Sequence, residues 1–373
     1  MRAERGAHRS PLVAQQRGER VLVAMSGGVD SSVAAALLKE QGFDVVGVTM
    51  RLFEDERKGE GERGCCGFGG ARDAARVAAK LGFPHYTWDF RKEFEAAVIE
   101  DFCSEYARGR TPNPCLRCNE ELKFTELLGR AAQLGAEQIA TGHYARVTRS
   151  DNGAWQLLRG ADAAKDQSYF LYEMTQAQLS RVLMPVGGYT KVEVREMARK
   201  LDLPVAEKPE SQDICFVPGN DYTVFLRRRC RELFRPGPVV DESGNPLGQH
   251  DGVVGFTLGQ RKGLGLAFGE RRYVARLEPE TNVVVLGSRD DVQARVVEAG
   301  SARWVSGLPP TSPLRVRASV RYQSSGGEAL VEPNGGDRVR VTFDEPQWAP
   351  TPGQAVVFWQ GDVVLGGATI GPE

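Results

Sequence analysis

The segment from Ser26 to Ser32 reads Ser-Gly-Gly-Val-Asp-Ser-Ser and combines two glycines with hydroxyl and carboxyl side chains. It follows a short apolar run at 21–25, typical of a buried parallel strand, and precedes a helical pattern that starts near Ser31. Glycines allow a tight turn, and the N–H groups at a helix start bind anions. The segment therefore predicts a site for a pyrophosphate-bearing ligand. It is not the P-loop of GTPases and kinases, because no Gly-Lys-Ser/Thr closes it.

Cysteines form the second group of reactive side chains. Cys115 and Cys118 lie in Thr-Pro-Asn-Pro-Cys-Leu-Arg-Cys-Asn, where two prolines fix an extended entry into a helix. We expect Cys118 near the first turn of that helix, where the dipole favours a thiolate. Such a pair could be a redox pair, half a zinc site or part of an iron–sulfur site, but the sequence has no second C-x-x-C and no paired histidines for a zinc finger. Cys215 lies in a loop-like setting, where a buried apolar cysteine is an equally good interpretation.

Composition is that of a soluble globular protein: 373 residues, 41% hydrophobic and 26% charged. No apolar stretch is long enough to span a bilayer, and the polar, arginine-containing first 19 residues do not resemble a secretory signal. Seven cysteines, an odd number, predict a reducing, cytoplasmic location without structural disulfides. The net charge of −1 does not by itself indicate nucleic-acid binding, and the arginine clusters are typical of solvated surfaces.

The chemistry-bearing segments must be positioned by alternating strands and helices. Strand patterns occur at 21–25, 44–50, 84–90 and 138–145, and helical patterns at 31–41, 71–81, 94–107 and 117–134. This alternation predicts a doubly wound α/β domain with a parallel sheet. Ligands of such sheets bind beyond the carboxyl ends of the strands, where Gly27-Gly28 and Gly142-His143 would lie.

The pattern changes along the second half of the chain. A Pro-containing linker at 204–221 lies between helical patterns at 191–201 and 222–233, and short alternating strands separated by turn residues follow from about residue 236. We predict four parts, namely a disordered tail (1–19), an α/β domain that carries the pyrophosphate site (20–216), a central mostly-β domain (217–290) and a C-terminal β-barrel (291–373). The charged insertion at 54–63 is expected to be mobile.

The strand–turn–helix at 21–41 resembles the PP-loop ATP pyrophosphatases, which are adenine-nucleotide alpha-hydrolase-like enzymes that cut ATP between its α and β phosphates. A closer resemblance, from about residue 20 to the C-terminus, is to the tRNA-specific 2-thiouridylases. The segments that carry it keep the family's order and lie at 26–32, 109–119, 140–146, 165–171, 211–216, 259–265, 321–323, 343–346 and 351–356.

This resemblance implies a reaction in which ATP adenylates the C2 oxygen of the wobble uridine of tRNA, and sulfur then replaces the oxygen to give 2-thiouridine, AMP and pyrophosphate. The implied ATP-binding residues are Ala24, Met25, Ser26, Gly27, Gly28, Val29, Asp30, Ser31, Met50 and Gly142. Mg²⁺ would screen the pyrophosphate charge. Asp30 is a plausible contributor, although a helix-capping role is equally plausible.

The resemblance also assigns the cysteines. Cys215 would carry a persulfide, and Cys118 would be the partner nucleophile that either closes a disulfide with Cys215 or first releases hydrosulfide. Both routes need the two sulfurs close together and a mobile 204–221 segment. A second mechanism places a [4Fe–4S] cluster on Cys115, Cys118 and Cys215. No role is implied for Cys65 and Cys66, and Cys103 and Cys230 are interpreted as packing or surface residues.

The implied partners are tRNA of the Lys, Glu and Gln type and a sulfur-relay protein or cysteine desulfurase, with no membrane. The target base must leave the anticodon stack to react. The implied tRNA-binding residues are Asn113, Pro114, Cys115, His143, Lys165, Asp166, Gln167, Arg321, Tyr322 and Gln354. Their ordinary interpretations are barrel core for Tyr322 and a strand-end cap for His143.

Two other functions fit parts of the sequence. A PP-loop ligase of the amidotransferase or argininosuccinate type would adenylate a small molecule without needing distant paired cysteines. A non-catalytic RNA-binding scaffold would retain only a vestigial nucleotide pocket. The complete motif at 26–32 disfavours the scaffold.

Overall fold

The structure is a computed structural model, and it describes residues 18–54, 68–210, 214–217, 219, 221–265 and 269–371. Most of the tail and of the charged insertion, together with Cys65 and Cys66, lies outside the described residues. So do residues 211–213, which precede the loop of Cys215.

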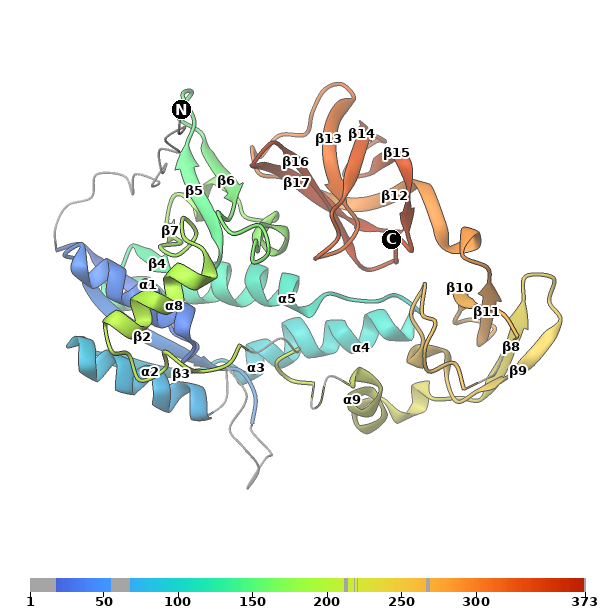
Figure 1. Cartoon of the computed structure of the whole chain (residues 1–373), viewed down its shortest axis with the longest axis horizontal. Helices are drawn as coiled ribbons and strands as arrows, with labels where there is room; N and C mark the ends of the chain where they lie inside the picture. The colour runs from blue at the N-terminus through green and yellow to red at the C-terminus, as the bar shows by residue number, and fades with distance from the viewer. Residues whose placement is uncertain are drawn as a thin grey trace, which may run out of the picture.

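A parallel five-stranded sheet with the order β3-β2-β1-β4-β7 forms the centre of the N-terminal domain. Its strands are β1 (Arg20–Ala24), β2 (Asp44–Arg51), β3 (His85–Asp89), β4 (Gln138–Ala140) and β7 (Val182–Leu183). Along β1 the side chains alternate, so that Leu22 enters one apolar cluster while Val21 and Val23 enter another on the opposite face. Because helices cover both faces (Figure 1), the predicted doubly wound sheet is confirmed.

One face of the sheet is covered by α1 (Val29–Glu40), α2 (Phe68–Leu81) and α8 (Lys191–Lys200). The other face carries two longer helical runs, each interrupted by a π-helical segment. The first run is α3 (Arg91–Phe94), the segment Glu95–Ile99 and α4 (Glu100–Ala107). The second is α5 (Pro114–Arg117), the segment Cys118–Glu126 and α6 (Leu127–Ala131), and a short α7 (Gln176–Leu179) follows later in the chain.

The prediction of one strand at 138–145 was wrong, because the observed strand is shorter. β4 ends at Ala140, and Ala145 begins a separate hairpin made of β5 (Ala145–Arg149) and β6 (Trp155–Arg159). This hairpin joins the C-terminal sheet, because Leu158 of β6 pairs with Val363 of the last strand, β17 (Val363–Ile370). The residues between β4 and β5 are therefore free to form the edge of a site.

The central and C-terminal parts are rich in strands, as predicted. After α9 (Tyr222–Arg229), a four-stranded sheet contains β8 (Gly237–Asp241), β9 (Pro246–His250), β10 (Tyr273–Glu278) and β11 (Val283–Gly287). The C-terminal strands are β12 (Gln293–Trp304), β13 (Leu314–Ser319), β14 (Gly327–Pro333), β15 (Val339–Trp348), β16 (Ala355–Gln360) and β17 (Val363–Ile370). Pairing of β12 with β17 closes these strands into the expected barrel.

Specific hydrogen bonds hold the barrel against the N-terminal domain, beside which it lies in Figure 1. The Tyr169 hydroxyl donates to the Ala355 carbonyl at 2.8 Å, and the Trp359 indole N–H donates to Ser168 Oγ at 3.2 Å. Both bonds are buried, so losing either would leave a polar group without water.

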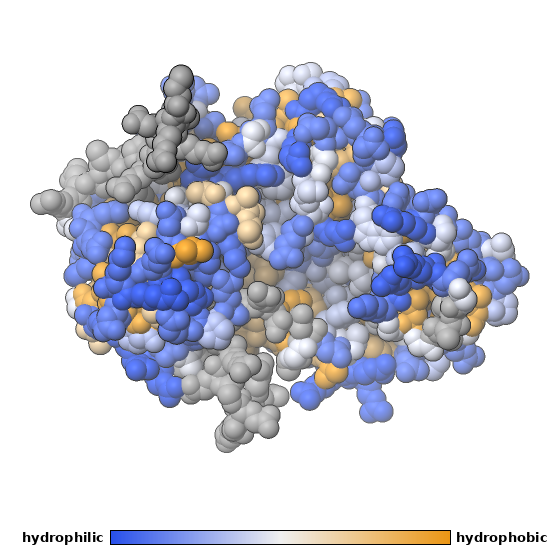
Figure 2. All heavy atoms as spheres, viewed as in Figure 1, coloured by the Kyte–Doolittle hydropathy of each residue, from blue (hydrophilic) through white to orange (hydrophobic). Residues whose placement is uncertain are grey.

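Hydrophilic residues cover most of the face seen in Figure 2, and the apolar residues on it lie in small separate groups. No helix among the described residues is long and apolar enough to cross a membrane.

Adjacent glycines after β7 provide a test of the packing between β5 and the loop that follows β7. A Cβ at Gly187 would lie 1.7 Å from the Ala145 carbonyl oxygen, whereas a Cβ at Gly188 meets nothing within 4 Å. We expect Gly187→Ala to lower the free energy of unfolding by about 1–3 kcal/mol, because backbone must shift to admit the methyl group. Gly188→Ala should change it by less than about 0.5 kcal/mol in the same urea titration. Equal stability of the two variants would contradict this packing.

Candidate functional site

The turn between β1 and α1 is tied together by its own serines. Gly28 is the N-cap of α1, and its carbonyl accepts a 2.7 Å hydrogen bond from Ser32 Oγ. Ser31 Oγ accepts from the Ser26 backbone N–H at 3.2 Å. The helix thus begins at Val29, two residues earlier than the sequence pattern indicated, and its first N–H groups lie within the predicted phosphate-binding segment.

Two glycines let neighbouring backbone reach this turn. Gly27 has φ of +72°, and a Cβ there would lie 2.1 Å from the Gly70 carbonyl oxygen of α2. A Cβ at Gly142 would lie 2.6 Å from the Ser31 nitrogen. The segment after β4 therefore packs directly on the start of α1, as the shared sheet edge predicted.

The other predicted nucleotide-binding residues lie along the same edge. Thr49 of β2 donates through Oγ1 to the Met25 carbonyl at 2.7 Å, which joins the ends of β1 and β2. Met50, the next residue, is buried in the core on the opposite face from the α1 cluster. Carboxyl ends of neighbouring strands thus bring together the residues assigned to ATP, namely Ala24, Met25, Ser26, Gly27, Gly28, Val29, Asp30, Ser31, Met50 and Gly142.

Asp30 does not cap α1, so the capping alternative was wrong. Its carboxylate accepts a 2.7 Å hydrogen bond from the Tyr144 hydroxyl and a 2.6 Å contact from Lys191 Nζ, because it lies in the first turn and faces α8. Burial, followed by the charge of Asp30, raises the pKa of Tyr144. Tyr144 therefore stays protonated and acts as a donor to Asp30.

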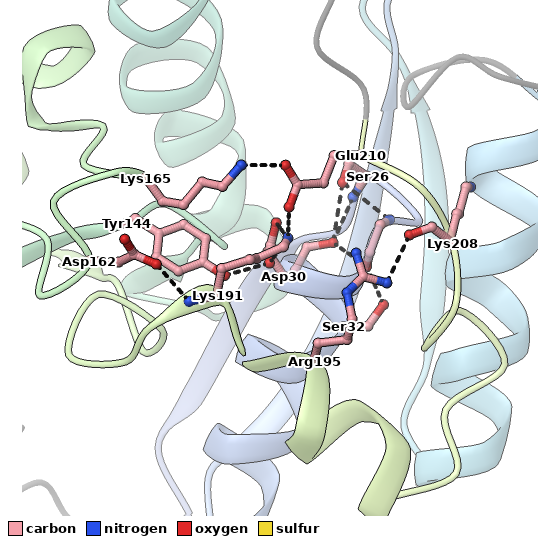
Figure 3. A network of polar contacts seen from close by, with 12 residues as sticks. Ser26, Asp30, Ser32, Tyr144, Asp162, Lys165, Lys191, Arg195, Lys208 and Glu210 are labelled. Atoms are coloured by element: carbon pink, nitrogen blue, oxygen red, sulfur yellow. Dashed lines mark hydrogen bonds and ion pairs between the residues drawn. The ribbon is translucent and has the colours of Figure 1, made fainter. Parts of the chain in front are cut away.

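An ion-pair network that sequence reasoning missed surrounds the turn (Figure 3). Lys191 also contacts Glu210 at 3.1 Å, and Glu210 in turn contacts Lys165 at 2.6 Å. Lys208 Nζ donates to the Gly27 carbonyl at 3.0 Å. A sequence signal existed for Lys191, because Thr190 and Glu193 form a capping box that fixes the start of α8. No comparable signal marked Lys208 or Glu210.

Cys118 is not in the first turn of its helix, and that expectation is corrected. Asn113 is the N-cap and Pro114 the first helical residue, so the helix starts three residues before the predicted position. The dipole acts mainly on the first turn and so reaches Cys115, whose N–H donates to Asn113 Oδ1 at 3.2 Å. Cys118 instead opens the π-helical segment.

Both predicted reactive thiols contact the larger core cluster. Cys118 is buried within the larger core cluster, and the half-buried Cys215 packs against the same cluster. Phe216, beside Cys215, makes edge contacts with Phe94 and Phe102 at 5.6 and 5.2 Å between ring centroids. Cys115 is exposed. The Cys103 and Cys230 thiols contact each other, and burial raises the pKa of Cys103 to about 12.

Among the residues that the structure describes, no three His, Cys, Asp or Glu side chains are placed to hold a metal ion together. Cys115, Cys118 and Cys215 are all described, and they do not belong to such a group of ligands for a single ion. The Asp30 carboxylate is likewise engaged by Lys191 rather than by a set of oxygen ligands.

Several predicted tRNA contacts meet where the barrel touches α5. The ring centroids of Tyr322 and Phe170 lie 4.4 Å apart. Burial, followed by the nearby Asp166 and Cys115, raises the pKa of Tyr322. Gln354 Nε2 donates to the carbonyls of Thr111 and Pro112 at 2.8 and 3.2 Å, and so fixes the chain that leads to Asn113 and Pro114. Arg321, next to Tyr322, is exposed.

Other predicted tRNA contacts are engaged within the protein. Asp166 Oδ1 accepts from the N–H groups of Gly160 and Ser168, and Gln167 Oε1 accepts from the Tyr144 N–H. Burial, then the charge of Lys123, lowers the pKa of His143, which is therefore neutral at pH 7 and offers hydrogen bonds rather than charge.

A cavity of about 530 Å³ opens between α4, α5 and the barrel. Its lining includes Asn113 together with Arg108, Arg110 and Arg117, and the acids Asp101, Glu105 and Glu173. Burial raises the pKa of Glu173 to about 7. The cavity is thus mixed in charge and borders the position assigned to the target base.

Family models match three consecutive parts of the chain. Residues 19–219 match the tRNA methyl transferase HUP domain, residues 223–288 the tRNA methyl transferase PRC-barrel domain, and residues 294–370 the Aminomethyltransferase beta-barrel domain. Among solved structures, a 4-thiouridine synthetase–RNA complex with bound ATP is 19% identical, covers 57% of this chain and 51% of that chain, and has a TM-score of 0.36.

Curated relatives match over nearly the whole chain. Proteins named tRNA-specific 2-thiouridylase MnmA from Heliobacterium modesticaldum and Carboxydothermus hydrogenoformans are each 52% identical over 94% of this chain, covering 92% and 97% of the respective relatives. The one from Moorella thermoacetica is 51% identical over 94% of this chain and 98% of its own length. With this similarity and the HUP-domain match, the chain belongs to the tRNA-specific 2-thiouridylase family.

Proposed function

We propose that this protein is a tRNA-uridine 2-sulfurtransferase that replaces the C2 oxygen of the wobble uridine with sulfur at the expense of ATP. The observation that supports it most is the combination, in one domain, of a glycine turn at a helix start with two thiols on the adjoining core cluster. The turn suits a pyrophosphate, and the thiols suit sulfur transfer. Relatives named tRNA-specific 2-thiouridylase MnmA, at 52% identity, support the same reaction.

In the first step, the uridine C2 oxygen attacks the α-phosphorus of ATP, and pyrophosphate leaves. The turn from Ser26 to Ser31 would hold the phosphates through backbone N–H groups. Mg²⁺ would screen the pyrophosphate charge when bound, but the described residues provide no preformed set of ligands, so we assign no step to it.

In the second step, the terminal sulfur of a Cys215 persulfide attacks C2, and AMP leaves with the former C2 oxygen. The Cys118 thiolate then attacks the Cys215 sulfur, which breaks the S–S bond and leaves the electron pair on the sulfur bound to C2. The products are 2-thiouridine and a Cys118–Cys215 disulfide, which an external thiol must reduce.

Recognition of tRNA would use the junction of α5 and the barrel. Asn113, Pro114 and Cys115 would border the flipped base, and Tyr322 offers an aromatic face beside them. The substrates would be tRNAs of the Lys, Glu and Gln type in the cytoplasm. A sulfur-relay protein or cysteine desulfurase would load Cys215.

The names of the matched domain models refer to methyl transfer, and a small-molecule PP-loop ligase remains the other enzyme class to test. Neither reaction needs two cysteines from distant parts of the sequence. Sulfur transfer does, and Cys118 and Cys215 lie on the same core cluster.

We expect Cys118→Ser and Cys215→Ser each to lower 2-thiouridine formation by at least about 100-fold, because either change removes a sulfur that must form or break an S–S bond. Mass spectrometry of nucleosides from cognate tRNA measures the product, and calorimetry should show ATP binding within about twofold of wild type. Cys103→Ser is the matched control and should retain activity, since Cys103 contacts Cys230. Full activity of either the Cys118→Ser or the Cys215→Ser variant would refute the proposal.

Cys115→Ser separates persulfide chemistry from cluster chemistry. The persulfide route predicts activity within about fivefold of wild type, because Cys115 forms none of the S–S bonds in that route. A cluster route predicts that Cys115→Ser loses activity together with its iron and its absorbance at about 400 nm. The measurement is thiolation by anaerobically purified protein alongside its iron content. An iron-dependent wild type that Cys115→Ser inactivates would contradict the persulfide route.

A further inference from the structure

We propose that Lys208 is a positioning residue for the nucleotide, which it serves by locking the orientation of the peptide between Gly27 and Gly28. This inference deepens the proposed function and rests on ATP being the ligand of the β1–α1 turn.

Lys208 is anchored on both sides. Its Nζ donates to the Gly27 carbonyl at 3.0 Å and contacts Asp73 Oδ2 of α2 at 2.7 Å. The side chains of Lys208 and Asp73 are only 23% and 21% exposed, so solvent competes weakly for these contacts. Arg195 of α8 donates to the Lys208 carbonyl at 3.2 Å, which fixes the backbone that carries the lysine.

The peptide that Lys208 holds is unusually free to turn over. Flipping a peptide plane changes ψ of the residue before it and φ of the residue after it. Here both residues are glycine, so no Cβ opposes the flip. The observed state already has Gly27 at φ of +72°, and Gly28 is at φ of −94°. A hydrogen bond to the Gly27 carbonyl therefore selects one of two accessible orientations.

The selected orientation matters for anion binding. In a trans peptide the C=O and N–H groups point in opposite directions, and the described residues contain no cis peptide. Since Lys208 holds the Gly27 carbonyl, the Gly28 N–H points to the other side, toward Ser26 Oγ, which it meets only at 3.4 Å. This N–H has a long and weak bond, so a phosphate oxygen can replace it. The flipped peptide would present a carbonyl oxygen to the phosphates instead.

A purely structural role would give a different result. If Lys208 served only to tie α2 to the segment at 206–208, removing it would loosen the whole pocket, and adenosine would be affected as much as ATP. If it positions the peptide, only ligands that carry phosphates should be affected.

Isothermal titration calorimetry of the full-length protein with ATP and with adenosine tests the proposal. Lys208→Met should raise the Kd for ATP about tenfold, the effect of losing one charge-assisted hydrogen bond, and leave the Kd for adenosine within about twofold. Lys208→Arg keeps a donor for the carbonyl and should recover most of the loss. In thiolation assays, KM for ATP should rise for Lys208→Met while kcat at saturating ATP stays within about threefold.

Lys39→Met is the matched control. Lys39 lies in the last turn of α1 and also donates to a glycine carbonyl, that of Gly82, at 3.4 Å, but far from the turn. It should leave both affinities unchanged. The inference is overturned if Lys208→Met binds ATP within twofold of wild type, if ATP and adenosine weaken equally, or if Lys208→Arg restores nothing. If the wild-type protein binds ATP but makes no 2-thiouridine, the proposed function fails while the inference about Lys208 stands, because the calorimetric comparison does not depend on thiolation.

Discussion

Backbone crowding at the turn between β1 and α1 is the constraint on which the site depends. The start of α2 reaches Gly27, and the segment after β4 reaches the first turn of α1 at Gly142, each at a distance that leaves no room for a Cβ. A side chain at either position would push the neighbouring backbone away from the start of α1. The N–H groups assigned to the phosphates would then no longer converge. The glycines are therefore a requirement of packing as much as of turn geometry.

The three lysines around this turn are each paired with a carboxylate before any ligand binds. Lys165, Lys191 and Lys208 face Asp30, Asp73 and Glu210, so these lysines and carboxylates are equal in number, and Arg76 also contacts Asp73 at 3.8 Å. A triphosphate thus meets no excess of lysine charge from this network. The triphosphate must then be attracted by the oriented backbone N–H groups at the start of α1. The lysines could contribute only by leaving their present partners. Lys191 is the least free to do so, because its side chain is only 12% exposed and contacts two carboxylates.

The sequence predicted the parts of this site that depend on local pattern. An apolar strand, a glycine turn and a helix follow each other within residues 20–40, and the strand ends at β1 and β4 fall on one sheet edge as their order required. The start of α5 was misplaced because both prolines were assigned to an extended entry, whereas Asn113 caps the helix and Pro114 is its first residue. The ion pairs of Lys191 with Asp30 and of Lys208 with Asp73 could not be predicted, since pairing across 161 or 135 residues leaves no local signal.

The C-terminal barrel is part of the site rather than an attachment to it. Gln354 holds the carbonyls just before Asn113, and Tyr322 lies against Phe170 close to Cys115 and Asp166. The hairpin of β5 and β6 follows the segment that contains Gly142, and β6 pairs with the last barrel strand. A displacement of the barrel would therefore move both the entry to α5 and the segment of Gly142 beside α1. If the barrel holds tRNA as proposed, this double connection would couple tRNA binding to the turn assigned to the nucleotide.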